Sequence, residues 1–328
     1  MRFLVIGAGS VGQRHCRNLA SLGQEVLVWD VDPARLREIG MVDRVRPIAT
    51  FEEGLAAGLD GALVCTPPAS HLALGRRALS AGAHLFVEKP ISHTREDVEA
   101  MLQLAKQSGR RVMVGYNLRF LDSLCRVKEL LGEKRIGKPL SVRAEFGAYL
   151  PDWRPGRDYR ENYAVRSELG GGILLDAIHE LDYLGWLFGE VIEVFCVDEH
   201  VSDLAGDTED LVEMTLRFES GLLAQLHLDY FQRPYRRNLQ VIGDGGDILW
   251  DYPSHTVTVL AAGAQAHPED LSARDGDANQ MYLSEMEHFI ECVQYGRSPL
   301  VDGWEALRSL RVVEAAKTSA SGRTWVKP

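Results

Sequence analysis

Cysteine is scarce in this sequence, and its distribution excludes two structural classes. The 328 residues contain five cysteines that are widely spaced and form no C-x-x-C pair, namely Cys16, Cys65, Cys125, Cys196 and Cys292. An odd, scattered set does not form the disulfide framework of a small secreted domain, and it lacks the ligand spacing of a structural zinc site. The pattern is typical of reduced thiols in a cytoplasmic protein.

Long apolar runs and an excess of positive charge are also missing. No apolar run reaches the roughly 18 residues that a membrane-spanning helix needs. The formal net charge is −11, which argues against non-specific binding to nucleic acid or to an anionic membrane surface. Repeats and low-complexity segments are absent as well. With 45% hydrophobic residues and a length beyond that of most single cores, the chain is expected to form two domains.

The first 115 residues alternate short apolar runs with helical patterns. Strands are expected near 2–6, 25–29, 44–48, 61–65, 84–87 and 111–115, and helices near 11–22, 33–40, 51–57, 70–81 and 94–108. Thr50 with Glu53, and Thr94 with Asp97, have the spacing of helix capping boxes. This alternation predicts a parallel, doubly wound α/β sheet over residues 1–120.

Residues 121–328 predict a second domain of the α+β class. Long alternating runs, such as those at 141–150, 191–201, 209–219 and 222–231, indicate a large open and mainly antiparallel sheet. Ser220 and Gly221 predict a hairpin turn between two of these strands. Few helices are available to cover both faces of such a sheet. We therefore expect a homodimer or homotetramer that associates through this sheet, and a C-terminal helix that packs back on the first domain.

A glycine-rich loop follows the first strand and begins the first helix. The loop Gly7-Ala8-Gly9-Ser10-Val11-Gly12 has the spacing of a dinucleotide-binding turn, which predicts cofactor contacts from Gly7, Gly9, Ser10, Val11 and Gly12. Asp30 ends the second strand, at the place of the acidic residue that accepts hydrogen bonds from the adenosine ribose. A carboxylate there would repel a 2′-phosphate, so the sequence favours NAD over NADP.

Two further segments contain ionisable residues in places that suggest chemistry. Lys89 follows Glu88 at the carboxyl end of a strand, where open α/β sheets bind ligands, and it could exchange a proton with a substrate hydroxyl. The segment GGGILLDAIHELD, residues 170–182, places three glycines before a helical pattern with Asp176 and His179. The glycines are expected to let substrate or nicotinamide approach the backbone. On a helical wheel Asp176, His179 and Glu180 share one face, and leucines and isoleucines form the opposite face.

Taken together, these segments resemble the Gfo/Idh/MocA oxidoreductases, the family of glucose-fructose oxidoreductase and inositol dehydrogenase. The resemblance rests on five ordered motifs: GAGSVG, CTPPASH (65–71), EKP (88–90), GYNLRF (115–120) and GGGILLDAIHELD. It implies a Rossmann domain, a C-terminal domain with an open sheet, and NAD(P)-dependent oxidation or reduction of a sugar or cyclitol hydroxyl. It also implies that further residues lie near the cofactor, namely Thr66, Pro67, His71, Glu88, Lys89 and Asn117.

The resemblance further implies catalytic roles for Lys89, Asp176 and His179. His179, oriented by Asp176, would remove the hydroxyl proton while hydride leaves the carbinol carbon, and Lys89 would hydrogen-bond the same oxygen; the roles of Lys89 and His179 could be exchanged. The family pattern is D-x-x-x-H in many members, whereas this chain has D-x-x-H. The shorter spacing indicates a subgroup with its own substrate.

The segment before the glycines combines arginines with aromatic residues. Guanidinium groups suit carboxylate or phosphate, and aromatic faces suit sugar rings or bases. The sequence therefore predicts an anionic sugar substrate: a nucleotide sugar, a sugar phosphate or an acidic sugar. Expected substrate contacts are Lys89, Asn117, Arg119, Trp153, Arg154, Arg157, Tyr159, Arg160, Asp176 and His179.

Two other functions remain compatible with the sequence, and no metal site is expected. A glycosidase or lyase could retain NAD and use transient oxidation at C3, and a non-catalytic regulator could bind NAD. Net NADH production distinguishes a dehydrogenase from the first. The presence of Lys89, Asp176 and His179 together argues against the second.

Overall fold

A computed structural model describes residues 1–154, 156, 158–263 and 265–328. Contacts within the chain divide it into two compact units. The first unit comprises Met1–Asn117 and Tyr282–Leu310, and the second comprises Leu118–Met281 and Arg311–Pro328. The units are therefore not two consecutive halves of the chain, because a late segment belongs to the first unit. No helix in the described ranges is both long and apolar enough to cross a membrane.

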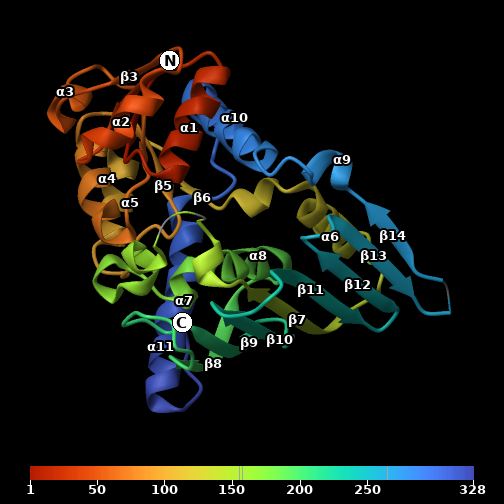
Figure 1. Ribbon diagram of the computed structural model, residues 1–328. Coiled ribbons are helices and arrows are strands. Elements are labelled where there is room, and N and C mark those ends of the chain that lie inside the picture. Colours follow the sequence, from red (N-terminus) through yellow and green to blue (C-terminus); the bar gives the residue numbers. More distant parts are fainter. Residues whose placement is uncertain (155, 157, 264) are drawn as a thin grey trace. The chain divides into compact units, whose positions relative to one another are not determined.

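The first unit is built on a six-stranded parallel sheet, as predicted (Figure 1). Its strands lie in the order β3-β2-β1-β4-β5-β6 and comprise β1 (Arg2–Ile6), β2 (Glu25–Trp29), β3 (Val45–Pro47), β4 (Gly61–Val64), β5 (His84–Glu88) and β6 (Val112–Gly115). The connecting helices are α1 (Ser10–Ser21), α2 (Pro33–Ile39), α3 (Phe51–Leu55), α4 (His71–Ser80) and α5 (Val98–Gln107). The order reverses between β1 and β4, and such a switch point places ligands at the carboxyl ends of the strands.

Two helix starts of this unit were predicted from capping residues, and the structure confirms one of them. Thr50 Oγ1 accepts a hydrogen bond from Glu53 N at 3.1 Å, which confirms the cap predicted for α3. The cap predicted at Thr94 is wrong. The helix α5 begins at Val98, and Asp97 precedes it in a left-handed conformation with φ of 63° and no side-chain cap.

The late segment of the first unit packs on the same sheet. It consists of α10 (Gln280–Tyr295) and the start of α11 (Gly303–Gly322). Phe289 of α10 contacts Phe3 and Phe86, with ring centroids 6.0 and 5.6 Å apart. Val114 N donates to Val301 O at 3.1 Å, so the connection between the two helices lies beside β6.

The second unit contains an eight-stranded, mostly antiparallel sheet, which confirms the predicted fold class (Figure 1). Its order is β14-β13-β12-β11-β7-β10-β9-β8, with strands β7 (Pro139–Gly147), β8 (Val191–Glu199), β9 (Leu211–Phe218), β10 (Leu223–Asp229), β11 (Arg236–Gly243), β12 (Gly246–Asp251), β13 (Thr256–Ala261) and β14 (His267–Asp270). One pair, β7 with β10, is parallel. Gly221 has a φ of 83° in the predicted hairpin turn between β9 and β10.

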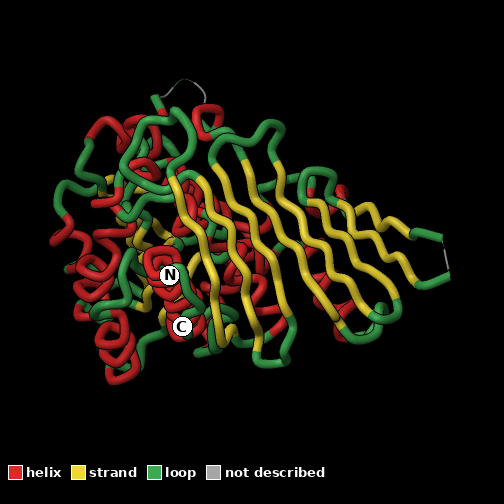
Figure 2. Tube along the Cα trace, turned by 90° about the horizontal axis from the view of Figure 1, so that it is seen from below, coloured by secondary structure: helices red, strands yellow, loops and turns green. Residues whose placement is uncertain are grey.

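Helices pack on one face of this sheet. These are α6 (Asp122–Gly132), which contacts β12 and β13, and α8 (Ile178–Phe188), which contacts β7. Buried Trp250 donates from Nε1 to Ser123 Oγ at 2.9 Å and packs edge-on against Tyr183. Figure 2 shows the strands side by side, and among the described residues no helix lies in front of the central strands.

Three elements of the second unit were not predicted. They are the strands β12 and β14 and the short helix α9 (Ser272–Asp275).

Candidate functional site

The loop between β1 and α1 has the backbone that a dinucleotide requires. Gly7 has a φ of +99°, and a side chain there would meet Cys65 O at 2.8 Å. A Cβ on Gly12 would overlap the carbonyl oxygen of Gly7, so this position admits only hydrogen. Around Gly9 nothing lies within 4 Å of the place where a Cβ would be. The loop is thus closed on the protein side and open at Gly9, directly before the N-terminus of α1, where phosphate groups bind favourably.

Asp30 lies beside this loop at the end of β2, as the sequence predicts. Its side chain is almost fully buried, and its Oδ2 accepts a hydrogen bond from Ala8 N at 2.6 Å. Its Oδ1 accepts from Asp32 N at 2.8 Å. The carboxylate is therefore fixed to the glycine loop itself. A fixed acceptor at the end of the second strand suits ribose hydroxyls, so the residues present fit a bound NAD.

A buried histidine joins the loop after β4 to the loop after β5. His71 is fully buried, with Nε2 2.7 Å from Thr66 O and Nδ1 2.8 Å from Pro90 O. Burial lowers the pKa of His71. Both ring nitrogens face backbone carbonyls, so this residue holds the two loops together. It thereby helps to position Lys89, which precedes Pro90 and is partly exposed.

Two other predicted residues of the first unit lie at strand ends. Glu88 ends β5, and its Oε1 is 2.6 Å from His15 Nε2. Asn117 follows β6 in a short 3-10 turn, Asn117–Phe120, and is 5% exposed. The strands β4, β5 and β6 are parallel neighbours, so their carboxyl ends lie at the same side of the sheet. Residues 66, 88, 89 and 117 lie at or just after these carboxyl ends.

Two of the three glycines before Ile173 are required by packing within the chain. A Cβ on Gly171 would collide with the carbonyl oxygen of Tyr163, and one on Gly172 would collide with the carboxylate of Glu209. Glu209 Oε1 also accepts a hydrogen bond from Leu174 N at 3.1 Å. Gly171 and Gly172 therefore make room for the chain's own backbone and for Glu209, which is reason enough for glycine at these two positions; the approach of a ligand to this backbone stays a prediction.

Asp176 and His179 lie on two short helices and not on one. Helix α7 (Ile173–Asp176) ends at Ala177, whose φ of −90° and ψ of 25° separate it from α8. The predicted division into an anchored apolar face and an open polar face is also wrong, because nearly all of the segment is buried. Within residues 170–184 His179 alone is partly exposed.

The buried acids of this segment each have a partner within the second unit. Asp182 accepts from Nε and Nη2 of Arg119 at 2.7 and 2.9 Å. Glu180, which is fully buried, accepts from Nε of Arg237 at 2.7 Å. These bidentate or near-bidentate pairs offset the cost of burying charge. Arg119, predicted to contact substrate, has its guanidinium engaged by Asp182 and is 4% exposed.

Asp176 is held by two tyrosines. Its Oδ1 accepts from Tyr163 OH at 2.9 Å and its Oδ2 from Tyr230 OH at 3.3 Å. Burial, together with the negative charge of Asp176, raises the pKa of Tyr230. Both tyrosines therefore act as hydrogen-bond donors, and they fix Asp176 just before the turn that leads to His179.

The remaining predicted substrate residues are spread over one segment of the second unit. Trp153 packs edge-on against Phe146 and Tyr230, with centroid distances of 6.0 and 5.4 Å. Tyr159 OH accepts a hydrogen bond from Ala205 N at 3.0 Å. Arg160 is exposed and paired with Asp158.

Arginines 154 and 157 complete the predicted set. Arg154 is exposed. Arg157 lies outside the described residues. Tyr163 and Arg237 were not among the expected substrate contacts, although they stand in two arginine- and tyrosine-rich segments, 149–166 and 232–237, and that composition was the available signal. Tyr230 gave none beyond its position at the end of a strand.

Comparison with known proteins settles the family. Residues 1–116 match the NAD-binding Rossmann fold of the Gfo/Idh/MocA oxidoreductases, and residues 128–327 match the C-terminal alpha/beta domain of the same family. The chain belongs to the Gfo/Idh/MocA oxidoreductases. It is thus an NAD-binding enzyme of a sugar dehydrogenase and reductase family, as its motifs predict.

Several relatives of this oxidoreductase cover it from end to end. Myo-inositol 2-dehydrogenase of Thermotoga maritima is 31% identical over 100% of this chain and 98% of its own length. The scyllo-inositol 2-dehydrogenase (NAD(+)) of Bacillus subtilis is 27% identical over 97% and 94%. Among solved structures, the WlbA dehydrogenase of Bordetella pertussis, in complex with NADH and UDP-GlcNAcA, has a TM-score of 0.88 over 100% and 97%, at 23% identity, and shows the same fold.

Replacing Gly9 by alanine tests the glycine loop. The Cβ would enter open space, so we expect the fold to be unaffected, whereas the methyl group would stand where the pyrophosphate approaches. The expected result is an unchanged Tm with an NAD affinity lowered on the order of tenfold or more, measured by calorimetric titration. Gly12→Ala is the matched control, because its Cβ would overlap Gly7 O and overpacking costs about 1–3 kcal/mol of stability. Unchanged NAD affinity in Gly9→Ala would contradict this account of the loop.

Proposed function

We propose that this oxidoreductase transfers hydride between NAD and a secondary hydroxyl, or the corresponding ketone, of a sugar or cyclitol. One observation carries the proposal: in the otherwise buried segment 170–184, His179 is the side chain that reaches solvent. An imidazole side chain suits a general base for a hydroxyl proton. The names of the inositol dehydrogenase relatives agree with this class of substrate.

In this proposal three side chains have separate roles in the reaction. His179 removes the hydroxyl proton, and Asp176, which is fixed by Tyr163 and Tyr230, sets the position of the turn before His179. Lys89 donates a hydrogen bond to the same substrate oxygen and stabilises its developing negative charge. When bound, NAD supplies the nicotinamide ring that accepts the hydride. Gly9, Asp30 and the N-terminus of α1 hold the cofactor.

The proposed substrate carries negative charge. Arg154 and Arg166 are exposed in the second unit, whereas Arg119 and Arg237 are already paired with internal carboxylates. Exposed guanidinium groups bind carboxylate and phosphate well. A nucleotide sugar, a sugar phosphate or an acidic sugar therefore fits the proposal better than a neutral sugar.

The lysine is tested by replacing it with alanine. Lys89→Ala removes the donor that stabilises the oxygen, so kcat/KM should fall by about 100-fold or more while the NAD affinity stays unchanged. Steady-state kinetics and a binding titration measure the two quantities. The control is Lys106→Ala, which removes an exposed lysine of α5 in the same unit. Wild-type turnover in Lys89→Ala would refute the assignment.

The reaction and the substrate charge are tested by an NADH absorbance screen. The panel contains myo-inositol, scyllo-inositol, neutral hexoses, uronic acids, sugar phosphates and UDP-sugars. We expect net NADH formation, faster with anionic members, and a KM for those members that rises in Arg154→Gln. Faster rates with neutral members would remove the anionic proposal. Product formation without net NADH would favour a lyase or glycosidase that uses transient oxidation.

We also infer that copies of the chain associate through the open face of the eight-stranded sheet. On β8 and β10 the exposed Val197 and Leu223 alternate with the buried Cys196 and Ala224, on a face that lacks covering helices in the described structure (Figure 2). Sedimentation velocity should show a dimer or tetramer, with Val197→Glu shifted toward monomer. Met41→Glu, at an exposed position of the first unit, should keep the wild-type mass. A wild-type monomer at all concentrations would disprove this inference.

A further inference from the structure

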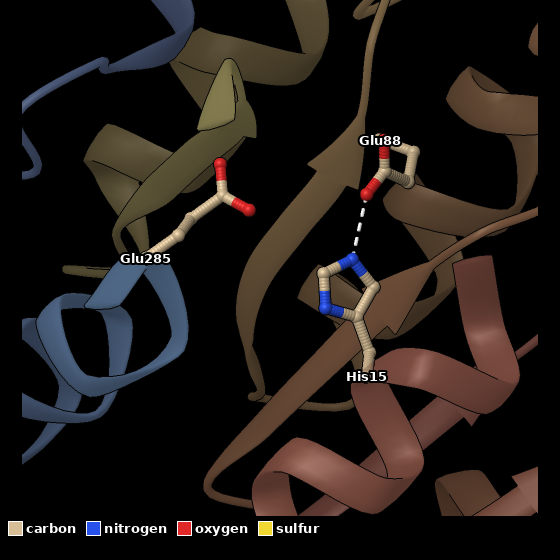
Figure 3. A group of neighbouring side chains, drawn as sticks. All are labelled: His15, Glu88 and Glu285. Carbon is tan, nitrogen blue, oxygen red and sulfur yellow. Dashed lines mark hydrogen bonds and ion pairs between the residues drawn. The ribbon is translucent and has the colours of Figure 1, made fainter. Parts of the chain in front are cut away.

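Three ionisable side chains that are distant in the sequence meet inside the first unit. His15 comes from α1, Glu88 from the end of β5 and Glu285 from α10 (Figure 3). One nitrogen or oxygen atom of each lies within 4.8 Å of the other two. Sequence reasoning did not find this cluster, because no local spacing connects its members.

Glu285 is the member that the rest of the protein leaves unsatisfied. Its side chain is 0% exposed, and neither carboxyl oxygen has a hydrogen-bond partner among the described residues. Figure 3 shows its carboxyl group directed toward His15 and Glu88. A buried, ionised and unpaired carboxylate would cost several kcal/mol, so the group needs either a positive charge or a proton.

His15 and Glu88 are already bound to each other. His15 Nε2 lies 2.6 Å from Glu88 Oε1, and the His15 ring is fully buried. The other oxygen of Glu88 accepts a hydrogen bond from the backbone N of Lys89 at 3.3 Å. The second ring nitrogen of His15, Nδ1, is buried without a partner in the described structure. The pair therefore presents a carboxylate oxygen and an unpaired ring nitrogen on the side of Glu285.

The distance between His15 and Glu88 favours a proton over a metal ion. Two ligand atoms that each lie about 2.0–2.2 Å from one ion are separated by roughly 3 Å or more. A separation of 2.6 Å is that of a hydrogen bond. A cation would have to break this bond before it could use both residues.

Further titratable groups lie around the cluster. Cys65 follows β4 and interacts electrostatically with Glu88 and Glu285, Cys16 of α1 interacts with Cys65, and His71 of α4 interacts with the charge of Glu88. The Tyr282 ring of α10 lies 6.0 Å from the His15 ring. Burial, followed by the charge of Glu88, raises the pKa of Glu285. Burial, with the charges of Glu88 and Glu285 as further causes, raises the pKa of Cys65.

We propose that Glu285 keeps its proton at neutral pH and is a positioning residue whose hydroxyl, directed at the His15–Glu88 pair, donates to it through a bridging water or after a small rotation of the side chain. The cluster then holds a single carboxylate, on Glu88, and that carboxylate is fixed from two sides. Because Glu88 also accepts from the backbone of Lys89, the buried acid would steady the residue that bears the catalytic amine. This last consequence rests on the proposed function of Lys89, whereas the protonation of Glu285 does not.

Stability measured against pH tests the protonation without any use of activity. The folded chain keeps a proton that the unfolded chain releases above its ordinary glutamate pKa of about 4.3. The stability that this proton confers is complete below that pH and is lost as pH rises toward the folded pKa. Glu285→Gln removes the effect. The ratio of unfolding constants, wild type over variant, should therefore grow about tenfold per pH unit above about pH 5, until the pH reaches the pKa of Glu285 in the folded protein.

The matched control is Glu287→Gln, which changes an exposed glutamate of the same helix and should leave the ratio independent of pH. A pH-independent ratio for Glu285→Gln would overturn the proposal. So would a ratio that falls as pH rises, because that result means that Glu285 is ionised in the folded protein. A rise of the wild-type Tm with added Zn²⁺, absent in Glu285→Gln, would replace the proton with a metal ion.

Infrared difference spectra measure the protonation of Glu285 a second time, in the folded protein and without unfolding it. The wild type should show a carboxylic-acid C=O band at neutral pH that Glu285→Gln lacks.

The positioning role is tested by kinetics. Glu285→Gln retains a neutral donor and should keep kcat, whereas Glu285→Leu should lower kcat with little change in KM. Equal kcat values in both variants would refute the positioning role. Loss of activity in Lys89→Ala is a separate result, so failure of the proposed function would be recognised independently.

Discussion

The cost of burying a carboxylate is the constraint on which both units depend. A buried acid needs hydrogen-bond donors or a positive partner, and each such partner ties together segments that are distant in the sequence. The bonds concerned are Asp30 to Ala8 N, Glu88 to His15, Asp182 to Arg119, Glu180 to Arg237, and Asp176 to Tyr163 and Tyr230. The backbone positions of the functional segments follow from these bonds as much as from apolar packing.

This constraint distinguishes residues of α8 that hold the helix in place from the one that is open to solvent. Glu180 and Asp182 are neutralised by arginines, so they hold α8 in place and are not available to a ligand. His179 directly precedes Glu180 on the same helix and remains partly exposed. Glu180 and Asp182 fix the position of α8, and this also fixes the backbone from which the His179 side chain extends. In the proposed function, pre-organisation of this kind would lower the cost of reaching the transition state.

Local patterns in the sequence predicted the parallel sheet and the glycine loop of the first unit and the class of the second unit, but they did not predict features that depend on distant partners. The turn at Gly7, the acid at Asp30 and the alternation of strands and helices depend on neighbours within a few residues or on one crossover. The break at Ala177 was not predictable in this way, because the partners of the flanking acids lie far away: Arg237 is 57 residues from Glu180, and Arg119 is 63 from Asp182. A helical wheel treats polar residues as solvent-facing, whereas here long-range ion pairs allow the polar face to be buried as well.

The central claim is that a hydroxyl-bearing carbon of the substrate gives its hydride to NAD. The most direct measurement uses the substrate found in the screen, carrying deuterium on that carbon, and analyses the cofactor by mass spectrometry after turnover. The account predicts one deuterium on the nicotinamide of NADH released into solution, in amounts equal to the ketone formed. Ketone or other product without deuterated NADH in solution would contradict it.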